Sequence, residues 1–110
     1  MNTSDDAKNL FEQDMWNSYT VPLKSPYHYN AHIFCQMIED YGGVGAAEKL
    51  LASDDIPYGL AKLYEIGMLN LSAEAIVLKP EYRQPYELFT RSQREIARQR
   101  LKKYYNYVAP

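Results

Sequence analysis

Apolar side chains recur every three or four residues along most of this chain, which is the spacing of one face of an α-helix. The first such stripe consists of Ala7, Leu10, Phe11, Met15, Trp16 and Tyr19. The stretch most like a strand, 75–78, is too short to found a sheet and has no second strand to pair with. The sequence therefore predicts an all-α fold.

Prolines, glycines and capping residues divide this pattern into helical segments. A linker is expected over 21–26, because each of its two prolines disfavours helix at the residue before it. Gly42-Gly43 is expected to end one helix, since glycine adopts the left-handed cap without a Cβ penalty. Thr90 to Gln93 matches a capping box. The predicted helices are 3–19, 27–41, 44–52, 57–66, 73–79 and 91–105.

The length of 110 residues corresponds to one domain. We predict a compact single-domain bundle of five to six short helices, with an N-terminal helix and linker over 1–26, a helical core over 27–105 and a tail over 106–110. The predicted core residues are Trp16, Phe34, Ile38, Leu50, Leu63, Leu78, Phe89 and Leu101.

Composition excludes several classes of protein. Apolar residues make up 46% and charged residues 24%, as in a soluble globular domain. No apolar stretch approaches the roughly 18 residues of a spanning helix, and the acidic N-terminus resembles no secretory signal. The single Cys35 cannot form an intramolecular disulfide. We therefore expect a cytoplasmic protein with no membrane partner.

Charge is distributed unevenly along the chain. Residues 1–78 hold four Lys and eleven Asp or Glu, a net charge of −7, whereas residues 79–110 hold eight Lys or Arg and three Glu, a net charge of +5. One interpretation is that the basic C-terminal part packs against the acidic remainder. The other is that the basic part contacts a partner.

The predicted helix over 91–105 carries the clearest candidate binding surface, a basic stripe followed by tyrosines. Its members are Arg91, Arg94, Arg98, Lys102, Tyr104 and Tyr105. Guanidinium groups suit phosphates or carboxylates, and tyrosine rings stack on bases or pack at protein interfaces. A solvated helix face is the third interpretation. The eleven tyrosines of the chain likewise fit either core edges or an interface.

Residues of metal-ligand type occur at helical spacing in His28, His32, Cys35 and Glu39. A single stripe of this length offers one ion only adjacent pairs. The favoured interpretation is a solvated helix face on which Cys35 is a small half-buried apolar residue. We predict no metal and no cofactor. The stretch 42–45 lacks the lysine and preceding strand of a phosphate-binding loop, and no nucleophile motif is present. We therefore predict that the chain is not an enzyme.

An ordered series of short motifs resembles a family of small uncharacterised bacterial proteins. The matching motifs include Tyr29-Asn30-Ala31, Gly42-Gly43, Ala46-Ala47, Leu50-Leu51, Leu63-Tyr64-Glu65, Gly67, Leu69-Asn70-Leu71-Ser72, Pro80-Glu81-Tyr82-Arg83 and Leu88-Phe89-Thr90. The chain departs from the family pattern at Tyr64, Met68 and Asn70 and in the longer loop at 84–86. The resemblance implies a helical fold and a diverged bacterial or phage-borne relative, and it implies no activity.

Together these features predict a non-enzymatic module that binds another macromolecule, with a protein as the favoured partner. In a bacterial or phage setting, an inhibitor or accessory of a defence system such as a nuclease complex is one expectation. The alternative is a nucleic-acid-binding module that uses the basic C-terminal helix. A homodimer would use the same surface chemistry.

Overall fold

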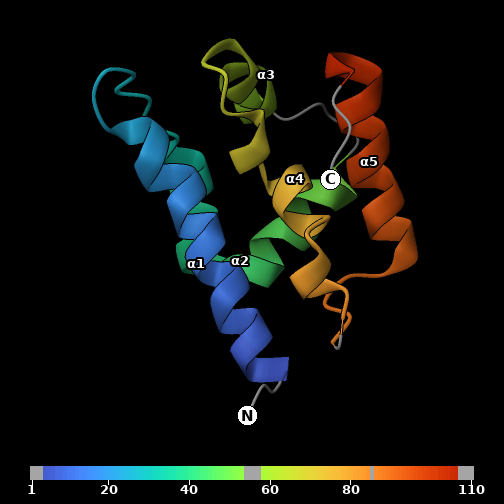
Figure 1. Cartoon of the computed structure of the whole chain (residues 1–110). Helices are drawn as coiled ribbons and strands as arrows, with labels where there is room; N and C mark the ends of the chain where they lie inside the picture. Colours follow the sequence, from blue (N-terminus) through green and yellow to red (C-terminus); the bar gives the residue numbers. More distant parts are fainter. Residues whose placement is uncertain (1–3, 54–57, 85, 107–110) are drawn as a thin grey trace.

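The computed structural model of the chain describes residues 4–53, 58–84 and 86–106, which form five α-helices and no strand (Figure 1). The helices are α1 (Ser4–Leu23), α2 (His32–Ala52), α3 (Tyr58–Glu65), α4 (Ala73–Val77) and α5 (Arg91–Tyr105), with short 3₁₀ turns at Leu69–Leu71 and Pro80–Tyr82. The all-α prediction is confirmed. Some predictions concern positions outside the described residues. These are Thr3 and Pro57, at which two helices were predicted to begin, and the tail residues 107–110.

Helix α1 is longer than predicted, because it continues through Pro22 to Leu23. The prediction of a linker beginning at residue 21 was therefore wrong. Pro22 has no N–H to donate to the preceding turn. Burial of its ring, and the bond that its carbonyl accepts from the Tyr29 N–H at 2.9 Å, stabilise the end of the helix. The buried residues Phe11, Met15, Ser18 and Pro22 form one stripe, and Leu10 lies off it with 46% of its surface exposed.

Helix α2 joins residues 32–41 of the segment predicted over 27–41 to the whole of the segment predicted over 44–52, with a kink between them. Gly42 has φ 75° and ψ 173°, a conformation essentially restricted to glycine, so the predicted break is present at that residue. The helix begins at His32 and not at Tyr27. The reason is a turn after α1, in which the Lys24 carbonyl accepts both the Tyr27 and His28 N–H groups.

The kink lets α2 cross α1 at close range. A Cβ atom built on Gly43 would lie 2.7 Å from the Glu12 Cα, so only glycine allows this approach. The Glu12 carboxylate also accepts the Gly43 N–H at 2.9 Å. The two helices are therefore fixed against each other at one point by sterics and by a hydrogen bond.

Side-chain caps position the last two helices. The Ser72 hydroxyl accepts the Ala75 N–H at the start of α4. The predicted capping box of α5 is present, since Thr90 Oγ1 accepts the Gln93 N–H at 3.1 Å and Gln93 Oε1 accepts the Thr90 N–H at 2.9 Å. These contacts confirm the predicted starts of both helices.

The core is centred on Phe11, whose ring lies 5.0 Å from Tyr82 and 4.9 Å from Phe89 between centroids. The Tyr82 hydroxyl donates to the Asp14 carboxylate, which also pairs with the Lys79 ammonium at 3.0 Å. The core prediction missed Phe11 and Tyr82. It was confirmed for Ile38, Leu63, Phe89 and Leu101, whereas Trp16, Phe34, Leu50 and Leu78 are only partly buried and pack against the core.

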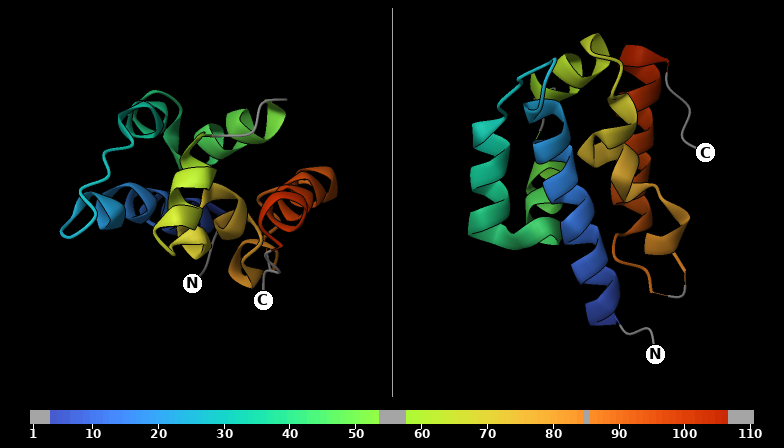
Figure 2. Two further views of the ribbon diagram at one scale, coloured as in Figure 1. Left: turned by 90° about the horizontal axis from the view of Figure 1, so that it is seen from above. Right: turned by 60° about the vertical axis from the view of Figure 1, so that its left-hand side comes forward.

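Helix α4 lies at the centre of the bundle, with α1 and α2 on one side and α5 on the other (Figures 1 and 2). All five of its residues are buried, because it contacts α1, α2 and α5. Helix α3 lies across one end of this arrangement (Figure 2). This placement leaves a space between α2, α3 and the start of α4.

Candidate functional site

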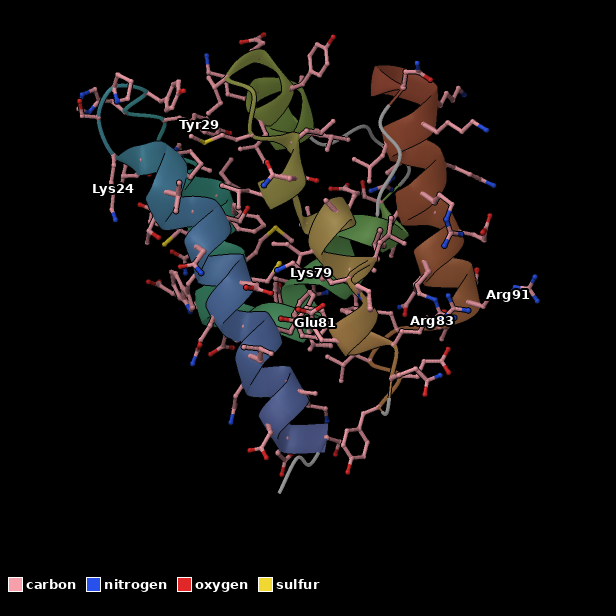
Figure 3. The ribbon with its side chains drawn as sticks, in the orientation of Figure 1. Lys24, Tyr29, Lys79, Glu81, Arg83 and Arg91 are labelled. Atoms are coloured by element: carbon pink, nitrogen blue, oxygen red, sulfur yellow. The ribbon has the colours of Figure 1, made fainter. Side chains whose placement is uncertain are left out.

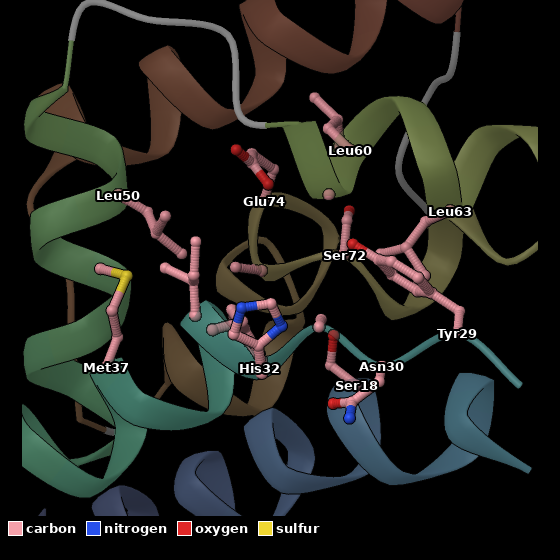
Figure 4. A pocket seen from close by; sticks show the side chains of 15 residues that line it. Ser18, Tyr29, Asn30, His32, Met37, Leu50, Leu60, Leu63, Ser72 and Glu74 are labelled. Carbon is pink, nitrogen blue, oxygen red and sulfur yellow. The ribbon is translucent and has the colours of Figure 1, made fainter.

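A pocket of about 360 Å³ occupies the space between α2, α3 and α4 (Figure 4). Helix α2 supplies Met37 and Leu50 to one side, and α3 supplies Leu60 and Leu63 to the other. Most of the surface is apolar. The lining residues are Ser18, Tyr29, Asn30, Ala31, His32, Ile33, Phe34, Met37, Leu50, Gly59, Leu60, Leu63, Ser72, Ala73 and Glu74.

Glu74 is the acidic residue that lines the pocket, and its side chain is only 3% exposed. One carboxylate oxygen lies 3.3 Å from Arg100 Nη1 of α5. Burial raises the pKa of the Glu74 carboxyl, while its own backbone N–H and Arg100 act in the opposite direction. The carboxylate is therefore held by a partner behind the pocket wall.

Arg100 links α5 to the end of α2 as well as to α4. Its guanidinium donates to the carbonyls of Leu50, Leu51 and Ser53 at the C-terminal end of α2. These carbonyls have no partner within the helix, so Arg100 serves as their cap. The sequence analysis did not single out Arg100, because its partners lie 26 to 50 residues away in the chain.

The remaining polar groups of the pocket lie toward residues 29–32, and several already have partners. Asn30 Oδ1 accepts the Tyr19 hydroxyl at 2.9 Å. A Cβ atom built on Gly59 would meet the Tyr29 hydroxyl at 3.6 Å, so Tyr29 reaches from the α1–α2 loop toward α3. His32 is exposed at the start of α2. The walls that α2 and α3 give to the pocket are mainly apolar, and the buried polar groups Ser72 and Glu74 lie on α4 and at its start.

An exposed isoleucine lies beside the pocket. Ile33, in the first turn of α2, lines the pocket and keeps 70% of its surface exposed, the largest value among the exposed large apolar residues. Tyr64 of α3 is 54% exposed, and Tyr41 of α2 is 52% exposed with Lys49 Nζ 4.5 Å from its ring centroid. Several tyrosines thus face solvent and not the core.

The predicted basic stripe is divided by the fold. Arg91 and Lys102 are exposed, and Figure 3 shows Arg91 directed away from the protein. Arg98 is exposed and paired with Glu95. Arg94 is 8% exposed, and its Nη1 donates to the Phe89 carbonyl at 2.7 Å and pairs with Glu87 at 2.8 Å.

Arg94 therefore does not share the exposed surface of the other three cations. The side chains of Tyr104 and Tyr105 lie outside the described residues. Whether the exposed cations bind a partner stays a prediction.

The four residues of metal-ligand type are not on one helix. His28 lies in the preceding loop with φ 52°, whereas His32, Cys35 and Glu39 lie on α2. The Cys35 thiol lies 3.9 Å from a Glu39 carboxylate oxygen. Within residues 4–53, 58–84 and 86–106, no group of three His, Cys, Asp or Glu side chains is placed to hold a metal ion.

Within the described part of the chain, the two oppositely charged parts meet at positions of opposite charge, one on α1 and one on α4. Lys79 pairs with Asp14, and Arg100 pairs with Glu74. Packing of the basic part against the acidic part is therefore observed at these positions. Arg98 of α5 pairs instead with Glu95 of its own helix.

Comparisons with protein-family models, curated proteins and solved structures find no match to this chain. The resemblance to the bacterial family stays a prediction. Among the helices of the described residues, none combines the length and apolarity needed to cross a bilayer.

Proposed function

We propose that this chain is a non-enzymatic module that binds another protein through its pocket face, defined here as Ile33, Phe34, Met37, Leu60 and Leu63. The observation that carries the proposal is the 70% exposure of Ile33 beside an apolar pocket. Full burial of an exposed isoleucine contributes about 1.5–3 kcal/mol. A partner that covers this face gains that contribution.

The size and lining of the pocket support this proposal. Protein interfaces draw most of their binding energy from a few apolar or aromatic anchors that fill desolvated pockets. A volume of about 360 Å³ lies at the small end of the roughly 300–1,000 Å³ typical of binding pockets.

The test is capture of a partner from a bacterial lysate by the tagged full chain, with and without nuclease treatment. Ile33→Asp is compared with Leu10→Asp, since both replace exposed aliphatic residues on helices and Leu10 does not line the pocket. We expect a stoichiometric protein that survives nuclease, is retained by Leu10→Asp and is lost with Ile33→Asp. Equal capture by both variants would contradict the proposal.

The captured protein also identifies the biological setting. An inhibitor or accessory role in a bacterial defence system stays a proposal that rests on the expected bacterial or phage origin. A nuclease or defence complex among the captured proteins would support it, and a partner from another pathway would replace it.

A second candidate function is nucleic-acid binding by α5, which the exposed side chains of Arg91, Arg98 and Lys102 favour. The test is the salt dependence of binding to duplex and single-stranded oligonucleotides. We expect Arg91→Glu combined with Lys102→Glu to weaken such binding strongly and to reduce the slope of its salt dependence. Binding that is absent or insensitive to salt in the unmodified chain would exclude this function.

A further inference from the structure

We infer that the pocket accepts one large apolar side chain carried on a partner segment rich in Lys or Arg. This inference rests on the proposed function and names the chemistry of the partner.

The inside of the pocket calls for an apolar group because its buried polar atoms already have partners. Glu74 pairs with Arg100, and the Ser72 hydroxyl accepts the Ala75 N–H at 3.1 Å. Among the described residues, no buried side-chain nitrogen or oxygen lacks a hydrogen bond. A polar ligand group would lose its water there without meeting a buried group that lacks a partner, whereas an apolar side chain would lose no hydrogen bond.

The charges around the pocket call for a basic segment. No Lys or Arg lines the pocket, and the charge of Glu74 is already matched by Arg100. Helix α2, which forms one wall, exposes three acids, Glu39, Asp40 and Glu48, and one base, Lys49. Helix α3, which forms the other wall, carries the ion pair Lys62–Glu65.

Asp40 lies close to the expected path of such a segment. It is seven residues after Ile33 and three after Met37, so the three side chains share one stripe of α2. Its carboxylate accepts the Gln36 amide at 2.9 Å and stays exposed. A cation beside the apolar anchor would therefore approach an exposed carboxylate.

The opposite side of the molecule has the opposite charge. Helix α5 exposes Arg91, Arg98, Lys102 and Lys103 against the single acid Glu95. Figures 1 and 2 place α5 on the side of the bundle away from α1. A polyanion would thus be drawn to α5 and repelled from α2, so the pocket and the basic surface select different partners.

Gly59 offers a way to close the pocket without disturbing the fold. It lines the pocket on α3, and a Cβ atom there meets only the Tyr29 hydroxyl, at an ordinary 3.6 Å. Its φ angle lies outside the left-handed range, so an L-residue fits the backbone. Gly59→Leu should extend a side chain into the pocket, and Gly59→Ala is the matched control that leaves most of the volume open.

The experiment selects short random peptides displayed on phage against the full-length chain. We expect the selected peptides to share one Leu, Met, Phe or Trp flanked by Lys or Arg. Binding of a synthetic selected peptide should weaken as salt rises and should fall about 30-fold with Gly59→Leu but little with Gly59→Ala. Replacing the apolar anchor of the peptide by Ala should have the same effect as Gly59→Leu.

Three outcomes would overturn the inference: no selected peptide, selected peptides rich in Asp or Glu, or equal binding to Gly59→Leu. Sedimentation of the free chain tests whether a second copy of the chain occupies the pocket. A dimer that is lost in both Gly59→Leu and Ile33→Asp would identify that second copy as the occupant in place of a basic segment. If Ile33→Asp abolishes capture of the cellular partner but Gly59→Leu does not, the proposed function stands and this inference fails. If Ile33→Asp has no effect on capture, the proposed function itself fails.

Discussion

Arg91 and Arg94 are close in sequence and chemically identical, yet α5 gives them different surroundings. Arg94 donates to the Phe89 carbonyl from a buried position, whereas Arg91 is exposed. We expect Arg94→Ala to lower the free energy of unfolding by about 1–3 kcal/mol, and Arg91→Ala by no more than about 0.5 kcal/mol. Urea denaturation of both variants measures this difference. Equal losses would place Arg94 at the surface.

Another single residue, Glu74, makes the free energy of unfolding depend on pH. Because burial raises its pKa above the ordinary value of 4.5, the folded state holds the proton more tightly than the unfolded state. This contribution is fully present below pH 4.5 and is lost as pH rises through the raised pKa. Glu74→Gln lacks it, so the stability of the native chain relative to Glu74→Gln should fall as pH rises. Urea midpoints across the acidic to neutral range check this, and a constant difference would contradict it.

At the scale of helices, two glycines respond oppositely to the same substitution. Gly43→Ala places a Cβ atom 2.7 Å from the Glu12 backbone and should lower the free energy of unfolding by about 1–3 kcal/mol. Gly59→Ala meets no such obstacle and should raise it by about 0.5–1 kcal/mol, because alanine favours the helix. Thermal denaturation of the two variants compares them directly. A stabilised Gly43→Ala would mean that α1 and α2 do not cross at this glycine.

At the scale of the whole molecule, the Phe11 ring of α1 packs against the rings of Tyr82 and Phe89, which are distant from it in the sequence. We expect unfolding to be a single transition, so that Trp16 fluorescence and far-ultraviolet circular dichroism should give coincident curves. Phe11→Ala should shift both curves together and cost about 3–5 kcal/mol. An earlier transition in Trp16 fluorescence would show that α1 detaches separately.

Local chemistry made the helices predictable from sequence. The capping box at Thr90, the break at Gly42 and the helical spacing of apolar residues each depend on neighbours within about one turn. The sequence predictions were wrong where contacts between residues distant in the sequence determine the local structure. At Pro22, burial of the ring and the bond from the Tyr29 N–H to the Pro22 carbonyl stabilise the end of α1, and neither contact is visible in a short stretch of sequence.

The candidate site was less accessible to sequence reasoning than the fold. The pocket combines residues of α1, α2, α3 and α4 that share no spacing pattern, so only their packing brings them together. Phe34 and Leu50 were predicted in the core and line the pocket instead, because apolar periodicity identifies an inward face but not what lies opposite it. The sequence by itself determined the helices, their caps and the charge of each part. Tertiary packing decided which cations stay exposed and where an apolar face stays uncovered.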